Sequence, residues 1–126
     1  MDDYKQIIIL RKDLNMRKGK MIAQGAHASM AVILNLKTED NASYIIPKDP
    51  RIVPWISGRF KKITVSVNSE DELLALHEEA KKRGFLTSLI LDSGLTEFKE
   101  PTYTAVAIGP DNAIELDKLT ANLPLL

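Results

Sequence analysis

Several kinds of residue are missing or scarce in this chain, and each scarcity argues against a class of protein. The 126 residues include no cysteine, which excludes disulfide scaffolds, thiolate zinc sites and cysteine nucleophiles. Only two histidines are present, with no His–Glu pair at helical spacing, so a catalytic transition-metal site is not expected. No apolar run approaches the roughly 20 residues that a membrane-spanning helix needs. The acidic start, Met1-Asp2-Asp3, lacks the pattern of a signal peptide.

Net charge is also lacking, because 17 lysines and arginines balance 17 aspartates and glutamates. The bulk charge therefore gives no general attraction to nucleic acid or to membranes. Hydrophobic residues make up 44% of the chain, enough for one core, and charged residues make up 27%. We expect a soluble, cytoplasmic protein with a single domain over residues 1–126.

Hydrophobic periodicity divides the chain into alternating strands and helices. The run Gln6-Ile7-Ile8-Ile9-Leu10 shows no polar alternation, which is typical of a strand covered on both faces. Strands are also predicted over 63–67, 86–91 and 103–108, and helices over about 17–37, 69–83 and 112–122. Residues 38–58, with three prolines, are predicted as an exposed loop that contains a short helix over 51–56, begun by Pro50. This order predicts an α/β fold: a three-layer α/β/α domain with a four-stranded mixed β-sheet and helices on both faces.

Local signals predict where elements begin and end, and which side chains they bury. Asn15 is a candidate cap for the first helix, and Asn68-Ser69, followed by three acids, is the expected capped start of the second. Gly109-Pro110-Asp111 is expected to end the last strand. The inward residues expected of the later helices are Leu73, Leu74, Leu76, Ala80, Ile114, Leu116 and Leu119. In the first helix, apolar or small residues recur at helical spacing at Ile22, Ala26, Met30, Ile33 and Leu34. Gly25 costs that helix about 1 kcal/mol relative to alanine, which indicates a packing or access reason.

A basic segment lies where the first predicted strand gives way to the first helix. Six basic residues and one acid lie between Arg11 and Lys37. Loops beyond the carboxyl ends of strands are where open α/β sheets bind ligands, and a helix N-terminus adds amide donors for an anion. Composition alone leaves a solvated cluster at a turn equally open.

Three polar residues share one face of the first predicted helix. Lys20, Gln24 and His27 are offset by four and seven residues, so they lie side by side next to very small neighbours. A cation, an amide and an imidazole together are unusual for a purely structural surface. A lone histidine on a helix is nevertheless more often structural than catalytic.

Asp92 follows an apolar strand and precedes a glycine in the segment Asp92-Ser93-Gly94-Leu95-Thr96. A carboxylate there is well placed to act as a base or to orient a water molecule. Hydroxyls that can supply hydrogen bonds nearby are those of Ser93, Thr96, Thr102 and Thr104. The alternative is a simple Asp-Ser-Gly turn between two strands. The residues alone favour the turn.

Together, and in chain order, these features resemble the type 2 peptidyl-tRNA hydrolase family. The block from Asp13 to Ala28 is similar to the family pattern D-L-x-M-x-K-G-K-x-A-A-Q-x-x-H-A. Asp92-Ser93-Gly94-Leu95-Thr96 resembles its D-A-G-x-T turn, and the segment from Thr104 to Pro110 resembles its T-V-L-x-I-G-P strand end. One departure is Leu95, where the family turn usually has arginine.

The resemblance implies an enzyme that cleaves the ester between a peptide and tRNA, with no metal and no organic cofactor. It implies a homodimer, because dimers are common in the family. As catalytic residues we predict Lys20, Asp92, Thr104 and His27, and as substrate-binding residues Gln24, Thr96, Arg17 and Lys18. The substrate partner would be the acceptor end of peptidyl-tRNA.

With no serine elbow, cysteine or metal set, direct attack by water is the expected mechanism. Asp92 would orient or deprotonate the water, and the Lys20 ammonium would stabilise the developing negative charge. Two rival interpretations keep the same fold: a non-catalytic RNA- or protein-binding domain, favoured by Leu95 and the long loop around residues 44–47, and a hydrolase of small esters.

Overall fold

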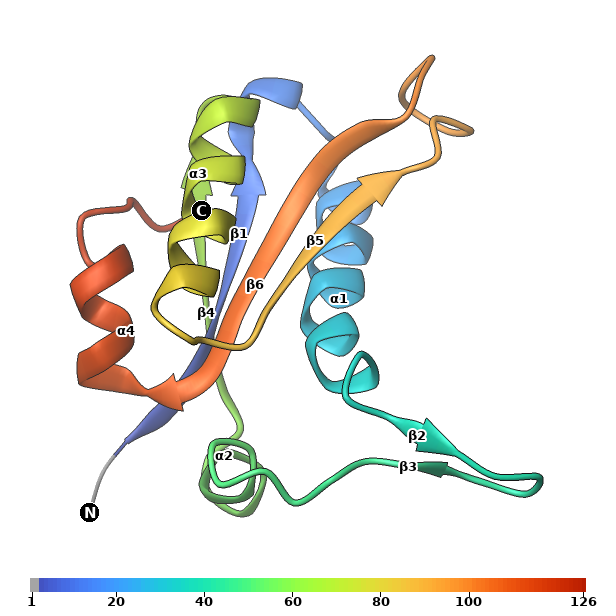
Figure 1. Cartoon of the computed structure of the whole chain (residues 1–126). Coiled ribbons are helices and arrows are strands. Elements are labelled where there is room, and N and C mark those ends of the chain that lie inside the picture. Colours follow the sequence, from blue (N-terminus) through green and yellow to red (C-terminus); the bar gives the residue numbers. More distant parts are fainter. Residues whose placement is uncertain (1–2) are drawn as a thin grey trace.

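Strand β1 (Tyr4–Arg11) lies in the middle of the sheet because its side chains are apolar toward both faces. The computed structural model describes residues 3–126 (Figure 1). Its main sheet has the strand order β4 (Lys61–Val67), β1, β6 (Thr102–Asn112), β5 (Thr87–Asp92). β1 runs parallel to β4 and antiparallel to β6, and β5 runs antiparallel to β6, so the predicted mixed sheet is confirmed.

Helices cover both faces of this sheet, as predicted. Ile7 and Ile9 pack with one cluster under α3 (Glu70–Lys82) and α4 (Ala113–Thr120). Ile8 and Leu10 pack with another under α1 (Lys18–Leu34). Successive residues of a strand point to opposite faces, so one short run serves both cores. The three layers are visible in Figure 1, with α3 and α4 on one side and α1 on the other.

The stretch between α1 and β4 is more ordered than the predicted loop. A hairpin of β2 (Thr38–Glu39) and β3 (Tyr44–Ile45) projects beyond the end of α1 (Figure 1). The short helix α2 (Val53–Ser57) begins later than predicted, with Pro54 rather than Pro50 in its first turn. Trp55 anchors it, because its buried indole donates a hydrogen bond to the Lys61 carbonyl at 2.8 Å.

The prediction that Gly109-Pro110-Asp111 ends the last strand is wrong. β6 continues to Asn112 and pairs again with β1, at Asp111 opposite Lys5, after a bulge. Backbone pairing persists because Gly109 adopts a φ of 96° and its carbonyl accepts a hydrogen bond from the buried Gln6 amide. Asn112 then caps α4 by accepting from the Ile114 and Glu115 amides.

Two expectations about helix ends have different outcomes. Ser69 caps α3 by accepting a hydrogen bond from the Glu72 amide, as the Asn68-Ser69 signal predicts. Asn15 does not cap α1, which begins at Lys18 after Arg17. Asn15 instead ends the short turn η1 (Lys12–Leu14) in the left-handed conformation, with φ 52°.

The residues that the helices bury also differ in part from the predicted ones. Leu73, Ala80 and Leu116 are fully buried, and Leu76 and Leu119 pack against them. Ile114 is exposed, since it lies on the outer side of a helix that touches the sheet through Leu116. In α1 the buried residues are Gln24, Gly25, Ala28 and Val32, whereas Ile22, Met30 and Leu34 are exposed.

Small side chains on the inner face let α1 lie close to the sheet. The Ala28 carbonyl, for example, accepts a hydrogen bond from Ser88 of β5 at 2.7 Å. No helix within residues 3–126 is both long and apolar enough to cross a bilayer.

Candidate active site

The candidate site lies at one end of the sheet, where β1 leads through η1 into α1. Lys20 and Gln24 come from the first turns of α1, one turn apart. Asp92 is the last residue of β5, and Thr104 lies near the start of the antiparallel strand β6. The helix α1 and the strand pair β5–β6, which are distant in sequence, therefore bring their polar side chains to one place.

Lys20 is the centre of the site. Its Nζ donates to Asp92 Oδ1 at 2.8 Å and to Thr96 Oγ1 at 2.6 Å. The Lys20 and Asp92 side chains are only 12% and 11% exposed. Charge-assisted hydrogen bonds are stronger than neutral ones, and a partly dry setting strengthens them further. The ammonium is therefore held in one position at the edge of solvent.

Asp92 has two further partners that fix its carboxylate. Gln24 Nε2 donates to Oδ1 at 3.3 Å, and the Gly94 amide donates to Oδ2 at 3.0 Å. The hydrogen bond from Lys20 lowers the pKa of Asp92 below its ordinary value of 3.8, against the opposing effect of burial. The Gly94 and Gln24 hydrogen bonds add to the lowering. At neutral pH Asp92 is thus a firmly ionised carboxylate that accepts hydrogen bonds.

Gln24 and Thr104 form the buried end of the same network. The Thr104 hydroxyl donates to Gln24 Oε1, and both residues are buried. Because the amide oxygen is used in this way, the amide nitrogen of Gln24 faces Asp92. Five of the predicted residues thus form one hydrogen-bonded chain: Thr104, Gln24, Asp92, Lys20 and Thr96.

The remaining predicted site residues stand apart from this chain. His27 is exposed on α1, and no residue that the structure describes makes a hydrogen bond with its side chain. The Arg17 side chain is 89% exposed and its Nε lies 3.8 Å from Glu97 Oε1, while Lys18 is exposed at the first position of α1. These three side chains are accessible to a ligand but make no contact with Asp92.

Some neighbours of the site are not indicated by the sequence pattern. The Phe98 ring centroid lies 5.6 Å from Lys20 Nζ, a cation–π distance. The Arg17 amide donates to Glu97 Oε2 at 3.3 Å, which ties the loop after β5 to the start of α1. Phe98 is one of three phenylalanines in the chain, and it lies in an irregular loop. No periodic pattern there indicates which way its side chain points, so the sequence does not predict that it lies near Lys20.

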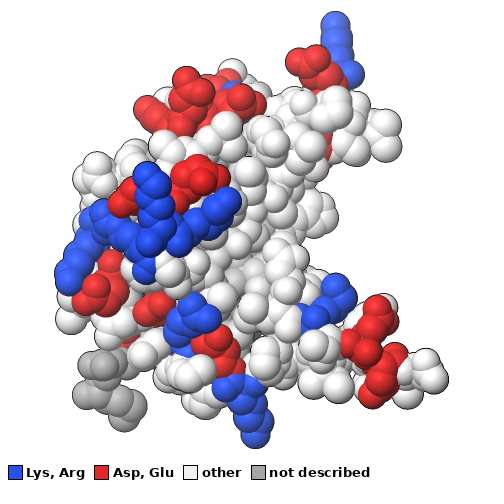
Figure 2. All heavy atoms as spheres, in the orientation of Figure 1, with Lys and Arg blue, Asp and Glu red and all other residues white. Residues whose placement is uncertain are grey.

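Charged side chains are unevenly spread over the face drawn in Figure 2. Most of them lie over α3 and along the rims, whereas the hollow between the loop after β5 and the β2–β3 hairpin is largely uncharged. Across residues 3–126, no three His, Asp or Glu side chains lie close enough together to hold a metal ion.

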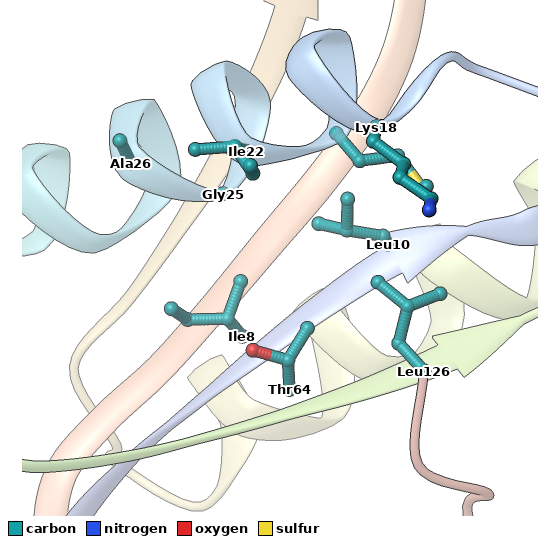
Figure 3. A pocket seen from close by; sticks show the side chains of 9 residues that line it. Ile8, Leu10, Lys18, Ile22, Gly25, Ala26, Thr64 and Leu126 are labelled. Atoms are coloured by element: carbon teal, nitrogen blue, oxygen red, sulfur yellow. The ribbon is translucent and has the colours of Figure 1, made fainter.

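Two cavities lie near α1, one at its N-terminal end beside Thr96 and one along the flank opposite to Gln24. A polar cavity of about 700 Å³ opens beside Thr96 and is lined by Leu14, Asn15, Arg17, Thr96, Glu97 and Phe98. An apolar groove of about 530 Å³ lies between the other flank of α1 and β4 (Figure 3). Ile8 and Leu10 form its floor, Gly25 and Ala26 lie along α1, and Leu126 closes it on the β4 side.

Comparisons with known proteins identify the family of this chain. The family described as Peptidyl-tRNA hydrolase PTH2 matches residues 4–126. A peptidyl-tRNA hydrolase of Methanocaldococcus jannaschii is 42% identical over 123 residues, covering 97% of this chain and 99% of the relative. One of Methanopyrus kandleri is 41% identical over 123 residues, covering 98% of each chain. One of Thermococcus onnurineus is 37% identical over 123 residues, again covering 98% of each.

The chain is thus a hydrolase whose mixed β-sheet lies between two layers of helices. It belongs to the peptidyl-tRNA hydrolase PTH2 family. The predicted family, and the prediction of an enzyme acting on peptidyl-tRNA, are confirmed by these matches.

Proposed function

We propose that the Lys20–Asp92 pair catalyses attack of water on the ester that joins a peptide to the terminal ribose of tRNA. One observation carries the proposal: a single ammonium is held between a carboxylate and the Thr96 hydroxyl at the edge of solvent. Such a pair can orient a water molecule and stabilise the negative charge that develops on the ester oxygen.

In the proposed reaction, the water oxygen bonds to the ester carbonyl carbon, and the bond from that carbon to the ribose oxygen breaks. The peptide leaves as a carboxylate, one proton ends on the ribose hydroxyl and the other goes to solvent. Because the pKa of Asp92 is lowered, its carboxylate orients the water more than it removes a proton. Lys20 faces the oxyanion that forms in the transition state.

Gln24 and Thr104 are proposed as positioning residues, since both are buried and bonded to each other. Their hydrogen bonds hold Asp92 in one orientation. Thr96 has an exposed position, from which its hydroxyl can reach the substrate as well as Lys20. His27 is proposed to contact the substrate from the solvent side of α1.

Arg17 and Lys18 are proposed to bind tRNA phosphates, because both are exposed at the basic start of α1. Phosphate contacts release counterions, so affinity should fall as salt is raised. A substrate made by the ribosome implies a cytoplasmic enzyme. Residues 1–126 are proposed to act as one domain and to form a homodimer, which the exposed apolar side chains Ile22, Met30 and Leu34 on α1 support.

The test is cleavage of N-acetyl-aminoacyl-tRNA by the purified chain, with and without EDTA. We expect release of deacylated tRNA at the same rate in both, since the proposed reaction uses neither a metal nor an organic cofactor. Loss of activity in EDTA, restored by a divalent cation, would contradict the metal-free mechanism. Binding of tRNA without cleavage by the folded protein would instead indicate a binding domain.

A further inference from the structure

We propose that the polar cavity beside Thr96 is the subsite for the 3′-terminal nucleoside of the substrate, with Phe98 stacking on the base and Asn15 reading its edge. This inference rests on the proposed function, and it names the part of the substrate that this region of the site holds. The cavity is lined by Leu14, Asn15, Arg17, Thr96, Glu97 and Phe98. Its volume of about 700 Å³ lies within the range of about 300–1,000 Å³ that is usual for small-molecule sites.

The cavity lies directly beside the catalytic pair. Thr96 lines the cavity and also accepts the hydrogen bond from Lys20, so the cavity begins where the catalytic pair ends. The ester to be cleaved is on the ribose of the last nucleoside, and the base is attached to that same sugar. When the ester carbonyl lies at Lys20, the base lies on the far side of the ribose from it. The cavity beside Thr96 lies at that distance from Lys20.

The lining matches the chemistry of a nucleobase. Phe98 and Leu14 are apolar and belong to the edge of the core cluster under α1, so they present a fixed surface. Bases released from a helix stack on aromatic rings of this kind. Phe98 also lies against the Lys20 ammonium, at 5.6 Å from ring centroid to Nζ, which brings the stacking surface next to the reacting group.

Asn15 supplies a polar group whose backbone is fixed in advance. Its left-handed conformation, φ 52°, is held by the hydrogen bond from its amide to the Lys12 carbonyl at 3.2 Å. The side-chain amide is exposed, and its hydrogen bond to the Asp13 carbonyl is long, at 3.5 Å. An asparagine amide can pair with both N6 and N7 of adenine, the base that ends every tRNA.

The rim fits the rest of the nucleotide. The exposed Arg17 guanidinium is suited to the phosphate that links the last nucleoside to the one before it. The Glu97 carboxylate lies at the same rim, 3.8 Å from Arg17 Nε, and accepts from the Arg17 amide. Its charge is thus offset by Arg17, and it can accept a hydrogen bond from a ribose hydroxyl.

The alternatives for this role are weaker. Gln24 is buried and already bonded at both ends of its amide, so it cannot read a base. The groove on the other flank of α1 is apolar apart from Lys18 and Thr64, and its lining includes neither Thr96 nor Asp92. The cavity beside Thr96, in contrast, combines an aromatic ring, an exposed amide and contact with the catalytic pair.

The experiment compares steady-state cleavage of N-acetyl-aminoacyl-tRNA by the wild type with three variants. Asn15→Gly removes the amide but tolerates the positive φ, and Phe98→Leu removes the ring but keeps an apolar side chain. Leu95→Ala, on the same loop but outside the cavity lining, is the matched control. Adenosine 5′-monophosphate serves as an inhibitor, with uridine 5′-monophosphate for comparison.

We expect Asn15→Gly and Phe98→Leu each to raise KM about 10-fold while kcat changes less than threefold, and Leu95→Ala to change neither. Adenosine monophosphate should inhibit the wild type competitively and better than the uridine nucleotide, and both cavity variants should lose this preference. If the wild type cleaves its substrate and Asn15→Gly keeps both the wild-type KM and the preference, the subsite is wrong and the proposed function stands. If the wild type does not cleave the substrate, both the proposed function and the subsite are contradicted.

Discussion

The two flanks of helix α1 differ sharply although they lie one residue apart in sequence. On one flank, Lys20 and Gln24 face β5 and β6 and meet Asp92 and Thr104. On the other, Gly25 faces Ile8 and Leu10 of β1 and lines an apolar groove (Figure 3). Polar side chains can lie on the first flank because β5 and β6 supply hydrogen-bond partners for them, and buried polar groups need such partners. Within the described chain every fully buried side-chain nitrogen and oxygen has one.

The residues of α1 alone therefore do not make the site. Apolar, small and polar residues alternate around α1, and the strand on each side decides which of them become functional. On the β5–β6 side a carboxylate ends one strand and a hydroxyl lies within the next.

The largest effect is expected at the ion pair. Lys20→Ala and Asp92→Ala should each lower kcat about 100-fold or more, the usual contribution of a general acid–base group or an oxyanion donor. Circular dichroism should show that both variants stay folded, because neither residue belongs to the hydrophobic clusters on the two faces of the sheet. Wild-type kcat in both variants would show that the reaction takes place elsewhere.

The next effect is expected at the buried end of the network. Thr104→Val keeps the shape but leaves Gln24 Oε1 without its donor, which should cost about 1–3 kcal/mol of unfolding free energy. A freer Gln24 amide should also lower kcat about 10-fold, through loss of Asp92 orientation. Thr104→Ser is the control, because it keeps the hydroxyl, and it should recover most of both losses in denaturation and kinetic measurements.

The pH dependence of stability and of activity follows from the lowered pKa of Asp92. A carboxyl whose pKa is lowered on folding contributes stability above its unfolded pKa, and this contribution is lost as pH falls through the lower, folded value. The acid limb of kcat/KM that belongs to Asp92 should therefore lie below pH 3.8. In Lys20→Ala, where the main cause of the lowering is gone, residual activity should fall at a higher pH. If activity is lost at the same pH in Lys20→Ala as in the wild type, a group other than Asp92 controls the loss.

Phosphate binding at the start of α1 should have a smaller and different signature. Arg17→Ala combined with Lys18→Ala should weaken tRNA binding and flatten the dependence of log affinity on log salt, by roughly 1 for each phosphate that is no longer bound. The value of kcat should stay within about threefold of the wild type, since neither side chain touches the catalytic pair. Filter-binding titrations across salt concentrations measure the slope, and an unchanged slope would place the tRNA body on another face.

The smallest effect is expected on the apolar flank. A Cβ added at Gly25 would lie 3.4 Å from Ile8 Cγ2 and 3.9 Å from Leu10 Cδ2, which are ordinary contacts. Gly25→Ala should therefore stabilise the helix by up to about 1 kcal/mol and leave kcat unchanged. Loss of stability in thermal melts would show that the groove does need the glycine, the packing reason that the sequence suggests.

Periodicity predicted the regular elements well, because strands and helices here carry clear apolar patterns. It failed where tertiary contacts outweigh local signals. The end of β6 is one case, since pairing with β1 carries the strand through Gly109-Pro110. The β2–β3 hairpin is another, because its strands are two residues long and exposed. The stripe around Ile22 and Met30 is a third, because small residues rather than large ones face the sheet.

The site could be predicted only through the resemblance. Spacing alone related Lys20 to Gln24, but nothing in it linked them to Asp92 or Thr104, which approach through the sheet. The pattern also grouped His27 with them, whereas the helix turns it to solvent. Phe98, Glu97 and the Gly94 amide lie in an irregular loop, where side-chain direction depends on the fold rather than on periodicity.

If Lys20 and Asp92 act as one unit, their contributions to kcat are coupled, and a double-mutant cycle measures that coupling. Single-turnover rates would be measured for the wild type, Lys20→Ala, Asp92→Ala and the double variant. Residues that act together are strongly non-additive, so we expect the double variant to be within about threefold of the slower single variant. Losses that multiply, so that the double variant is slower by the product of the two single effects, would contradict a shared role.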